Sequence, residues 1–350
     1  MKIVGCDLHT RYQQIAMLDQ ETGELVERRL EHESGEARAF YSGLSAAVRV
    51  GIEATGHTRW FERMLGELGH ELWIGDAAQI RASVVRKQKT DARDAAHLLD
   101  LLLSNRFPRI WRPSLEERDL RQLVWHRQKL VWMRNAVGNQ LHALAMGEGV
   151  CRKKKLFTKK GRVELESLKL GEWASHRRQE LLTMIDQLDA SLKELDQAVA
   201  KQAEKNPSAT LLMTHPGVGP VTSLAFVLTL GPVERFERSK QVVSYLGLNP
   251  REHSSGGRQR LGAISKQGNP MMRSLLVEAG HTAARLDAEL RQDYQRLKIR
   301  RGSGVAKVAI ARKLAVRMYW MLRSPASYAQ LVRMQGSPGG TLVASKTSLA

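Results

Sequence analysis

Short apolar segments separated by turns fill the first 110 residues, and their length and alternation restrict this part of the chain to a sheet covered by helices. Residues 2–9 are a short apolar run that contains an acid near its end, and residues 11–19 and 23–32 alternate apolar and polar side chains. Together they predict a meander of three strands. Residues 47–56 and 70–76 are short apolar runs that predict two more strands. We therefore predict an α/β domain over residues 1–112.

Helices are predicted between and after these strands. Residues 57–69 form an amphipathic pattern that Gly69 closes, and residues 77–88 also have a helical pattern. Thr90 is a suitable N-cap for a helix over residues 91–105, because its hydroxyl can accept a hydrogen bond from the first turn.

The rest of the chain has the pattern of helices. Residues 113–208 predict long helices joined by a basic loop, and Leu181, Ile185, Leu188, Leu192 and Leu195 recur at steps of three and four. This spacing indicates an antiparallel helical hairpin or a coiled coil between subunits. Residues 209–325 predict a mostly helical C-terminal domain. Residues 326–350 end in a stretch rich in Gly and Ser and predict a flexible tail.

The charge of the chain is strongly positive and unevenly distributed. Lys and Arg number 55 against 36 Asp and Glu, which gives a formal net charge of +19. The first 110 residues hold 15 basic and 16 acidic residues, so the excess lies in the remainder. Such an excess is unusual for a metabolic enzyme and predicts a polyanionic partner, either nucleic acid or, less often, a membrane surface.

Other features of the sequence bear on the compartment. No apolar run of about 18 residues occurs, so no transmembrane helix and no membrane partner are predicted. The N-terminal segment carries Asp7 where a secretory signal would be apolar. Cys6 and Cys151 are the only cysteines and lack the spacing of metal ligands. We expect a reduced, cytoplasmic protein without a cysteine-based metal site.

Three segments carry groups expected to contact phosphates. Residues 151–162 hold seven basic residues in twelve, and an ordinary solvated loop is the alternative for them. Pro216-Gly217-Val218-Gly219 before an apolar helix is typical of a helix-hairpin-helix, whose glycines let backbone N–H groups reach a phosphate; a simple glycine turn is the alternative. A loop rich in Gly and Ser covers residues 254–270. The residues predicted to bind nucleic acid are Arg152, Lys153, Lys154, Lys155, Lys159, Lys160, Gly217, Gly219, Arg251, Arg258, Arg260 and Lys266.

Four acids form the candidate catalytic site. Asp7 ends the first predicted strand, Glu53 ends the fourth, and Asp91 and Asp94 fall on one face of a helix. If the first and fourth strands are neighbours, a helix packed on the sheet could bring all four carboxylates together. Their repulsion would require divalent cations, and oxygen ligands suit Mg²⁺ or Mn²⁺. Two such ions promote in-line displacement at phosphorus, as in ribonuclease H-like folds. The alternative for Asp91 and Asp94 is a favourable interaction with the helix dipole.

Six short motifs follow one another in an order that is specific although each motif alone is weak. They are GCDLH around Asp7, GIEATG around Glu53, KTDARDA around Asp91 and Asp94, PGVGPVTS, YLGLNPREHSSG and ISKQGN. Through them the chain resembles the DEDD transposases of insertion-sequence family 110, relatives of the invertase Piv, over roughly residues 3–325.

The resemblance implies an architecture, a reaction and partners. It implies a RuvC-like N-terminal domain, a coiled-coil linker and a C-terminal transposase domain. It implies that Asp7, Glu53, Asp91 and Asp94 hold the metal and that Ser255, directly before a glycine, is a nucleophile; the doublet makes Ser254 the alternative. It further implies DNA as substrate, a structured bridge RNA as guide, a homo-oligomer (dimer or tetramer), and a place at the bacterial nucleoid.

A serine hydroxyl is a poor nucleophile without activation, so its surroundings matter. Arg251, His253, Arg258 and Arg260 are close in sequence and could stabilise the charge that develops on a phosphate. Two other functions stay open. A junction resolvase or nuclease would use the four acids with water as nucleophile and would not need Ser255. A non-catalytic nucleic-acid-binding protein is disfavoured because all four acids are present.

Overall fold

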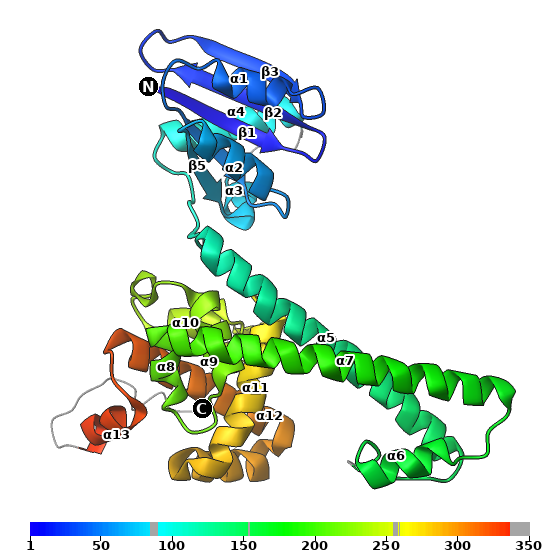
Figure 1. Cartoon of the computed structure of the whole chain (residues 1–350). Coiled ribbons are helices and arrows are strands. Elements are labelled where there is room, and N and C mark those ends of the chain that lie inside the picture. Colours follow the sequence, from blue (N-terminus) through cyan, green and yellow to red (C-terminus); the bar gives the residue numbers. More distant parts are fainter. Residues whose placement is uncertain (85–89, 153–154, 255–257, 259, 337–350) are drawn as a thin grey trace. The chain divides into compact units, whose positions relative to one another are not determined.

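The computed structural model divides the chain into two compact units, Met1–Arg112 and Pro113–Ala350 (Figure 1). It describes residues 1–84, 90–152, 155–254, 258 and 260–336. Each unit has its own hydrophobic core and is described by itself below.

A five-stranded sheet forms the centre of the first unit. Its strands are β1 (Lys2–Leu8), β2 (Tyr12–Asp19), β3 (Leu25–Glu31), β4 (Arg49–Glu53) and β5 (Glu71–Gly75), in the order β3-β2-β1-β4-β5. The first three strands pair antiparallel, whereas β4 lies parallel to β1 and β5 lies parallel to β4. The α/β fold and all five predicted strands are confirmed, and the first and fourth strands are neighbours.

Helices cover both faces of this sheet. Helices α1 (Glu36–Ser42) and α2 (Arg59–Glu67) pack on one face, while α3 (Ala77–Ser83) and α4 (Asp91–Leu103) contribute to the core of the other. The alternation in β1 explains this division, since Val4 and Cys6 belong to the first core and Ile3 to the second. The short helix α1 was not predicted from the sequence.

Two glycines let α4 lie against the backbone of the sheet. Gly5 of β1 and Gly51 of β4 are partners in the strand register. A Cβ on Gly5 would lie 2.2 Å from the Ala95 carbonyl oxygen and 2.4 Å from the Leu99 nitrogen, both backbone atoms of α4. A Cβ on Gly51 would lie 2.7 Å from a Leu102 methyl carbon. The approach of α4 to β1 and β4 therefore depends on the absence of side chains at these positions.

Long helices dominate the second unit. Helices α5 (Leu115–Gly147) and α7 (Glu172–Lys205) run side by side and antiparallel (Figure 1). Arg127 pairs with Asp196 at 2.8 Å and Arg134 pairs with Asp189. Residue numbers along α7 therefore decrease as those along α5 increase, as expected for antiparallel helices. This is the helical hairpin that the sequence predicted as one of two possibilities.

The segment between these helices is more structured than the predicted basic loop. Helix α6 (Lys159–Glu166) lies at the end of the hairpin (Figure 1). Leu156 and Leu165 are fully buried and pack with Leu141 and Leu182 of the hairpin. The prediction of a loop is therefore wrong for residues 159–166, because two leucines anchor this basic segment.

The remaining helices surround an apolar core. They are α8 (Pro207–Met213), α9 (Pro220–Leu230), the 3₁₀ turn η1 (Val233–Arg235), α10 (Ser239–Tyr245), α11 (Pro270–Leu286) and α12 (Ala288–Arg323). Helix α9 is almost entirely buried, and α12 is kinked at Gly302. A small hairpin of β6 (Pro250–Glu252) and β7 (Leu261–Ile264) stands where the sequence predicted only a loop.

The start of the predicted tail is ordered. Helix α13 (Tyr328–Gly336) buries Leu331 in the core, and the Tyr328 hydroxyl donates a hydrogen bond to the buried Asp287. The prediction of a flexible tail is wrong for residues 328–336, because these apolar and aromatic contacts hold the helix. Residues 337–350 lie outside the described residues. Among the helices that the structure describes, none is long and apolar enough to cross a membrane.

The contact between α4 and the sheet generates a stability prediction. We expect Gly5→Ala to destabilise the protein by about 1–3 kcal/mol, because the added methyl group must push α4 away from β1. Gly66→Ala in α2 is the matched control, since a Cβ there meets nothing within 4 Å and alanine favours helices by up to about 1 kcal/mol. Urea unfolding of both variants checks this; equal stability of Gly5→Ala and wild type would refute the close-packing argument.

Candidate active site at the edge of the sheet

The strand register brings the first two predicted acids to one edge of the sheet. Cys6 of β1 pairs with Ile52 of β4, so Asp7 and Glu53 follow next to each other at the carboxyl ends of parallel strands. Asp91 is the first residue of α4 and Asp94 lies in its first turn. The Thr90 hydroxyl accepts a hydrogen bond from the Arg93 N–H at 3.4 Å, which confirms the predicted N-cap.

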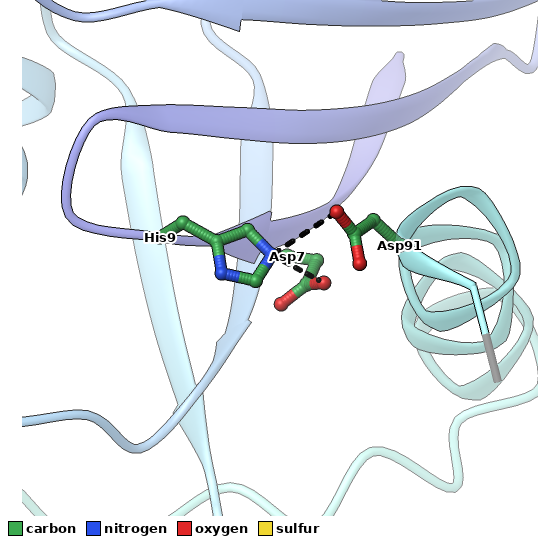
Figure 2. Close-up of side chains that lie close together, drawn as sticks. All are labelled: Asp7, His9 and Asp91. Carbon is green, nitrogen blue, oxygen red and sulfur yellow. Dashed lines mark hydrogen bonds and ion pairs between the residues drawn. The ribbon is translucent and has the colours of Figure 1, made fainter.

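A histidine that the sequence analysis did not consider connects two of the acids. Nε2 of His9 lies 3.1 Å from Oδ2 of Asp7 and 3.5 Å from Oδ2 of Asp91. Figure 2 shows the three side chains facing one another between the end of β1 and the start of α4. The Tyr12 hydroxyl donates a hydrogen bond of 2.8 Å to the same Asp91 oxygen. His9 and Tyr12 therefore hold Asp91 toward Asp7.

The electrostatics of Asp7 show that a third acid takes part. Burial raises the pKa of Asp7, and the negative charges of Asp94 and Asp91 raise it further, whereas His9 opposes this shift. Three of the four predicted carboxylates thus act on one another at this edge. Such mutual repulsion is typical of groups arranged to bind a cation.

Glu53 lies at the expected strand end, but its carboxylate is paired with an arginine and not with His9, which contacts Asp7 and Asp91. Its Oε1 lies 3.8 Å from a guanidinium nitrogen of Arg81, in α3. Arg81 is mostly exposed, so this pair is weak and can be exchanged for another partner. The structure therefore places Glu53 beside Asp7 in the sheet, with its side chain turned to a surface arginine.

The donor atoms at this edge fit a divalent cation. Asp7, His9 and Asp91 can each offer one ligand atom, and these atoms lie within 4.8 Å of one another. Carboxylate oxygens are the ligands that Mg²⁺ and Mn²⁺ prefer, and imidazole nitrogen is also a common metal ligand. The sequence did contain a signal for His9. Residues two apart along a strand point to the same face, and His9 comes two residues after Asp7, directly after the end of β1.

In the second unit, two predicted motifs pack together at the base of the small hairpin. A Cβ on Gly247 would lie 2.0 Å from the Gln267 carbonyl oxygen, and one on Gly268 would lie 2.2 Å from that of Tyr245. The Ser265 hydroxyl also donates a hydrogen bond of 2.7 Å to Asn249. The glycines of YLGLNP and SKQGN thus hold the base of the hairpin whose strand β6 is followed by Ser254 in the sequence.

The serine doublet is described only in part. The Ser254 hydroxyl donates a hydrogen bond of 2.6 Å to Glu252 and accepts one of 3.1 Å from the Arg260 N–H, so it bridges the two sides of the hairpin. Ser255 lies outside the described residues. The predicted phosphate-binding residues Arg251, Arg258, Arg260 and Lys266 are all exposed.

The other predicted phosphate-binding groups have diverse surroundings. Lys155, Lys159 and Lys160 are exposed, whereas Arg152 makes a bidentate pair with Glu164 at 2.7 and 3.0 Å; Lys153 and Lys154 lie outside the described residues. Gly217 has a φ of 87° and packs against the α11 backbone at Ala283, so its conformation and packing both require glycine. Gly219 is exposed at the start of α9, with open space around it.

The raised pKa of Asp7 leads to a prediction in the absence of metal. A carboxyl whose folded-state pKa is raised lowers stability at neutral pH and ceases to do so once it is protonated in acid. We expect Asp7→Asn to raise the melting temperature in EDTA at pH 7, by about 2–4 °C for each kcal/mol gained. The gain should shrink as the pH falls toward the acid range. Calorimetry across pH checks this, and a variant less stable than wild type at pH 7 would contradict the repulsion.

Comparison with known proteins identifies the family. A DEDD transposase model of IS110 elements matches residues 4–147, and the model of the IS116/IS110/IS902 transposase family matches residues 209–295. The first match contains all four predicted acids and the second contains the serine doublet.

Relatives match along most of the chain. A probable family 20 transposase of Pseudomonas aeruginosa is 28% identical over 340 residues, which cover 92% of this chain and 96% of that protein. The transposase for insertion sequence element IS1111A of Coxiella burnetii is 27% identical over 94% of this chain and 91% of its own length. A pilin gene-inverting protein of Moraxella bovis is 26% identical over 66% of each chain. Together with the fold and the acidic edge of its sheet, these matches show that the chain belongs to the IS110 family of DNA transposases and recombinases.

Proposed function

We propose that this transposase cuts and rejoins DNA by phosphoryl transfer at the acidic edge of its sheet. Asp7, Glu53, Asp91 and Asp94 hold Mg²⁺ or Mn²⁺ in this proposal. The observation that carries it is the contact of His9 with both Asp7 and Asp91, to which the effect of the Asp91 and Asp94 charges on the pKa of Asp7 adds. A bound divalent cation would polarise the phosphate and offset the negative charge that repels a nucleophile.

The residues of the chain have distinct tasks in this reaction. His9 and Tyr12 orient the carboxylates through the contacts at Asp7 and Asp91. The Ser255 hydroxyl gives up its proton and its oxygen attacks the phosphorus, so that an O–P bond forms to the serine. The bond to the departing strand end breaks, and that end takes up a proton. The protein–DNA ester conserves the bond energy, and attack by a new strand end reverses the step and rejoins DNA.

Ser255 is preferred to Ser254 on two grounds. Ser255 directly precedes the glycine, as the family pattern requires, and the Ser254 hydroxyl is engaged across the hairpin by Glu252 and Arg260. Glu252 could also act as a base toward Ser254, so this serine is the alternative nucleophile. Since Asp7 and Ser255 belong to different compact units, the proposal requires the two groups to meet in the working assembly, from one subunit or from two.

The positive charge of the second unit supports the remaining proposals. The exposed basic residues at Lys155, Lys159 and Lys160 and on the small hairpin would neutralise phosphates of DNA and of a bridge RNA. We propose a dimer or tetramer as the active form and, because the relatives are bacterial, DNA of the bacterial nucleoid as substrate. Sequencing RNA that copurifies with the protein tests the guide.

The covalent intermediate provides the test of the mechanism. With a DNA substrate that is nicked near the cut site, the wild-type protein should give a denaturant-resistant adduct on the peptide that contains Ser254 and Ser255. We expect Ser255→Ala and Asp94→Ala to abolish the adduct, by at least about 100-fold in rate, while Ser254→Ala retains it. Mass spectrometry of the trapped peptide measures the outcome. Cleavage by Ser255→Ala would show that water is the nucleophile, as in a resolvase, and full activity of Asp94→Ala would refute the metal site.

A further inference from the structure

A partly exposed aromatic pair lies at the same edge of the sheet as the candidate active site. The backbone N–H of His32 donates a hydrogen bond of 2.8 Å to the backbone carbonyl of Arg11. His32 therefore lies next to the turn that joins β1 to β2. The ring of His32 lies 4.5 Å from that of Trp60, edge to face, and Trp60 follows β4 in the first turn of α2. The strand that carries Glu53 thus leads toward Trp60, and the turn after the strand that carries Asp7 lies beside His32.

A contact of His32 places the pair near His9. Nδ1 of His32 lies 3.4 Å from the carbonyl oxygen of Thr10, the residue that follows His9. Burial is the main cause of the lowered pKa of His32, and the charge of His9 lowers that pKa further. His9 itself contacts both Asp7 and Asp91. The aromatic pair therefore lies beside the turn that carries His9.

The fold does not need Trp60 in its core. Helix α2 buries Phe61, Met64 and Leu65 against the sheet, whereas Trp60 lies off this stripe and is 39% exposed. Its ring is nevertheless fixed in place, by His32 on one side and by Phe61 at 5.4 Å. A large aromatic ring that is rigid and partly open to solvent is the form that base-stacking platforms take.

Two arginines adjoin the pair through the backbone, since Arg59 precedes Trp60 and the Arg11 carbonyl accepts the hydrogen bond of His32. Arg11 and Arg59 are both exposed, and within the described part of the chain no ion pair is found for either. A DNA strand that approaches clustered carboxylates is repelled by them, so nearby arginines and a stacking surface are needed to hold it there. The charge and the aromatic surface are complementary to a single strand whose phosphates face Arg11 and Arg59.

We propose that Trp60, supported by His32 and flanked by Arg11 and Arg59, is a platform on which a base of the DNA strand stacks beside the site of cleavage. This inference rests on the proposed function, because it assigns the edge near Asp7 as the place where DNA is cut. Trp60 positions the strand and takes no part in the chemical step.

Binding without cleavage tests the platform. The full-length protein is titrated in EDTA with a fluorescein-labelled single-stranded DNA oligonucleotide, and anisotropy is measured. Trp60→Leu keeps the apolar bulk without the aromatic face and should weaken binding roughly tenfold, while Trp60→Phe should recover most of it. Trp173→Leu is the matched control: Trp173 is 77% exposed, pairs with His176 and belongs to α7 of the other compact unit.

Several outcomes would overturn the proposal. These are unchanged binding by Trp60→Leu, an equal loss in Trp173→Leu, and tighter binding of an RNA oligonucleotide of the same sequence. If Trp60→Leu fails to fold, ultraviolet crosslinking of the wild-type protein to DNA that contains 5-bromodeoxyuridine decides, since the adduct must map to the peptide with Trp60. Asp94→Ala should still bind DNA in EDTA, at least as tightly as wild type because one repelling carboxylate is gone, and should still crosslink at Trp60. Failure of the platform is therefore distinct from failure of the proposed metal site.

Discussion

The contact between α4 and the two central strands is the constraint on which the candidate site depends. Gly5 and Gly51 lie side by side in β1 and β4 and leave no room for a Cβ beneath α4. Because the helix lies against the strand backbone, its first turn reaches the strand ends, and Asp91 and Asp94 come close enough to Asp7 to raise its pKa. A larger residue at position 5 would displace α4 and so move Asp91 and Asp94 away from Asp7, without contacting any of these carboxylates.

Bringing these acids together is unfavourable without compensation. Asp7 is partly buried and faces two further negative charges, while His9 and the Tyr12 hydroxyl offset part of the repulsion at Asp7 and Asp91. The fold thus holds a destabilising cluster in place through backbone packing, which is the usual relation between a rigid scaffold and a site that binds a cation. The same edge carries Trp60 and Arg11, so one end of the sheet combines acidic chemistry with groups suited to a DNA strand.

Sequence reasoning succeeded where a local pattern determines the structure. Strand alternation predicted the sheet, and Thr90 predicted the start of α4, because both depend on neighbours in the chain. It missed His9, whose role arises from a contact with Asp91 far along the sequence. It was also wrong for residues 159–166 and 328–336, where Leu165 and Leu331 fix basic or polar segments through tertiary packing that periodicity does not reveal. The glycines at 217, 247 and 268 proved to support close backbone packing.

Binding of divalent cations at the acidic edge of the sheet can be tested without any DNA, by counting bound Mn²⁺ with electron paramagnetic resonance. The full-length protein should bind Mn²⁺ tightly, and Asp7→Ala and Asp94→Ala should each lose that binding. Glu164→Ala, which removes an acid paired with Arg152 in the other unit, should bind Mn²⁺ like wild type. Equal Mn²⁺ binding by wild type, Asp7→Ala and Asp94→Ala would contradict the account.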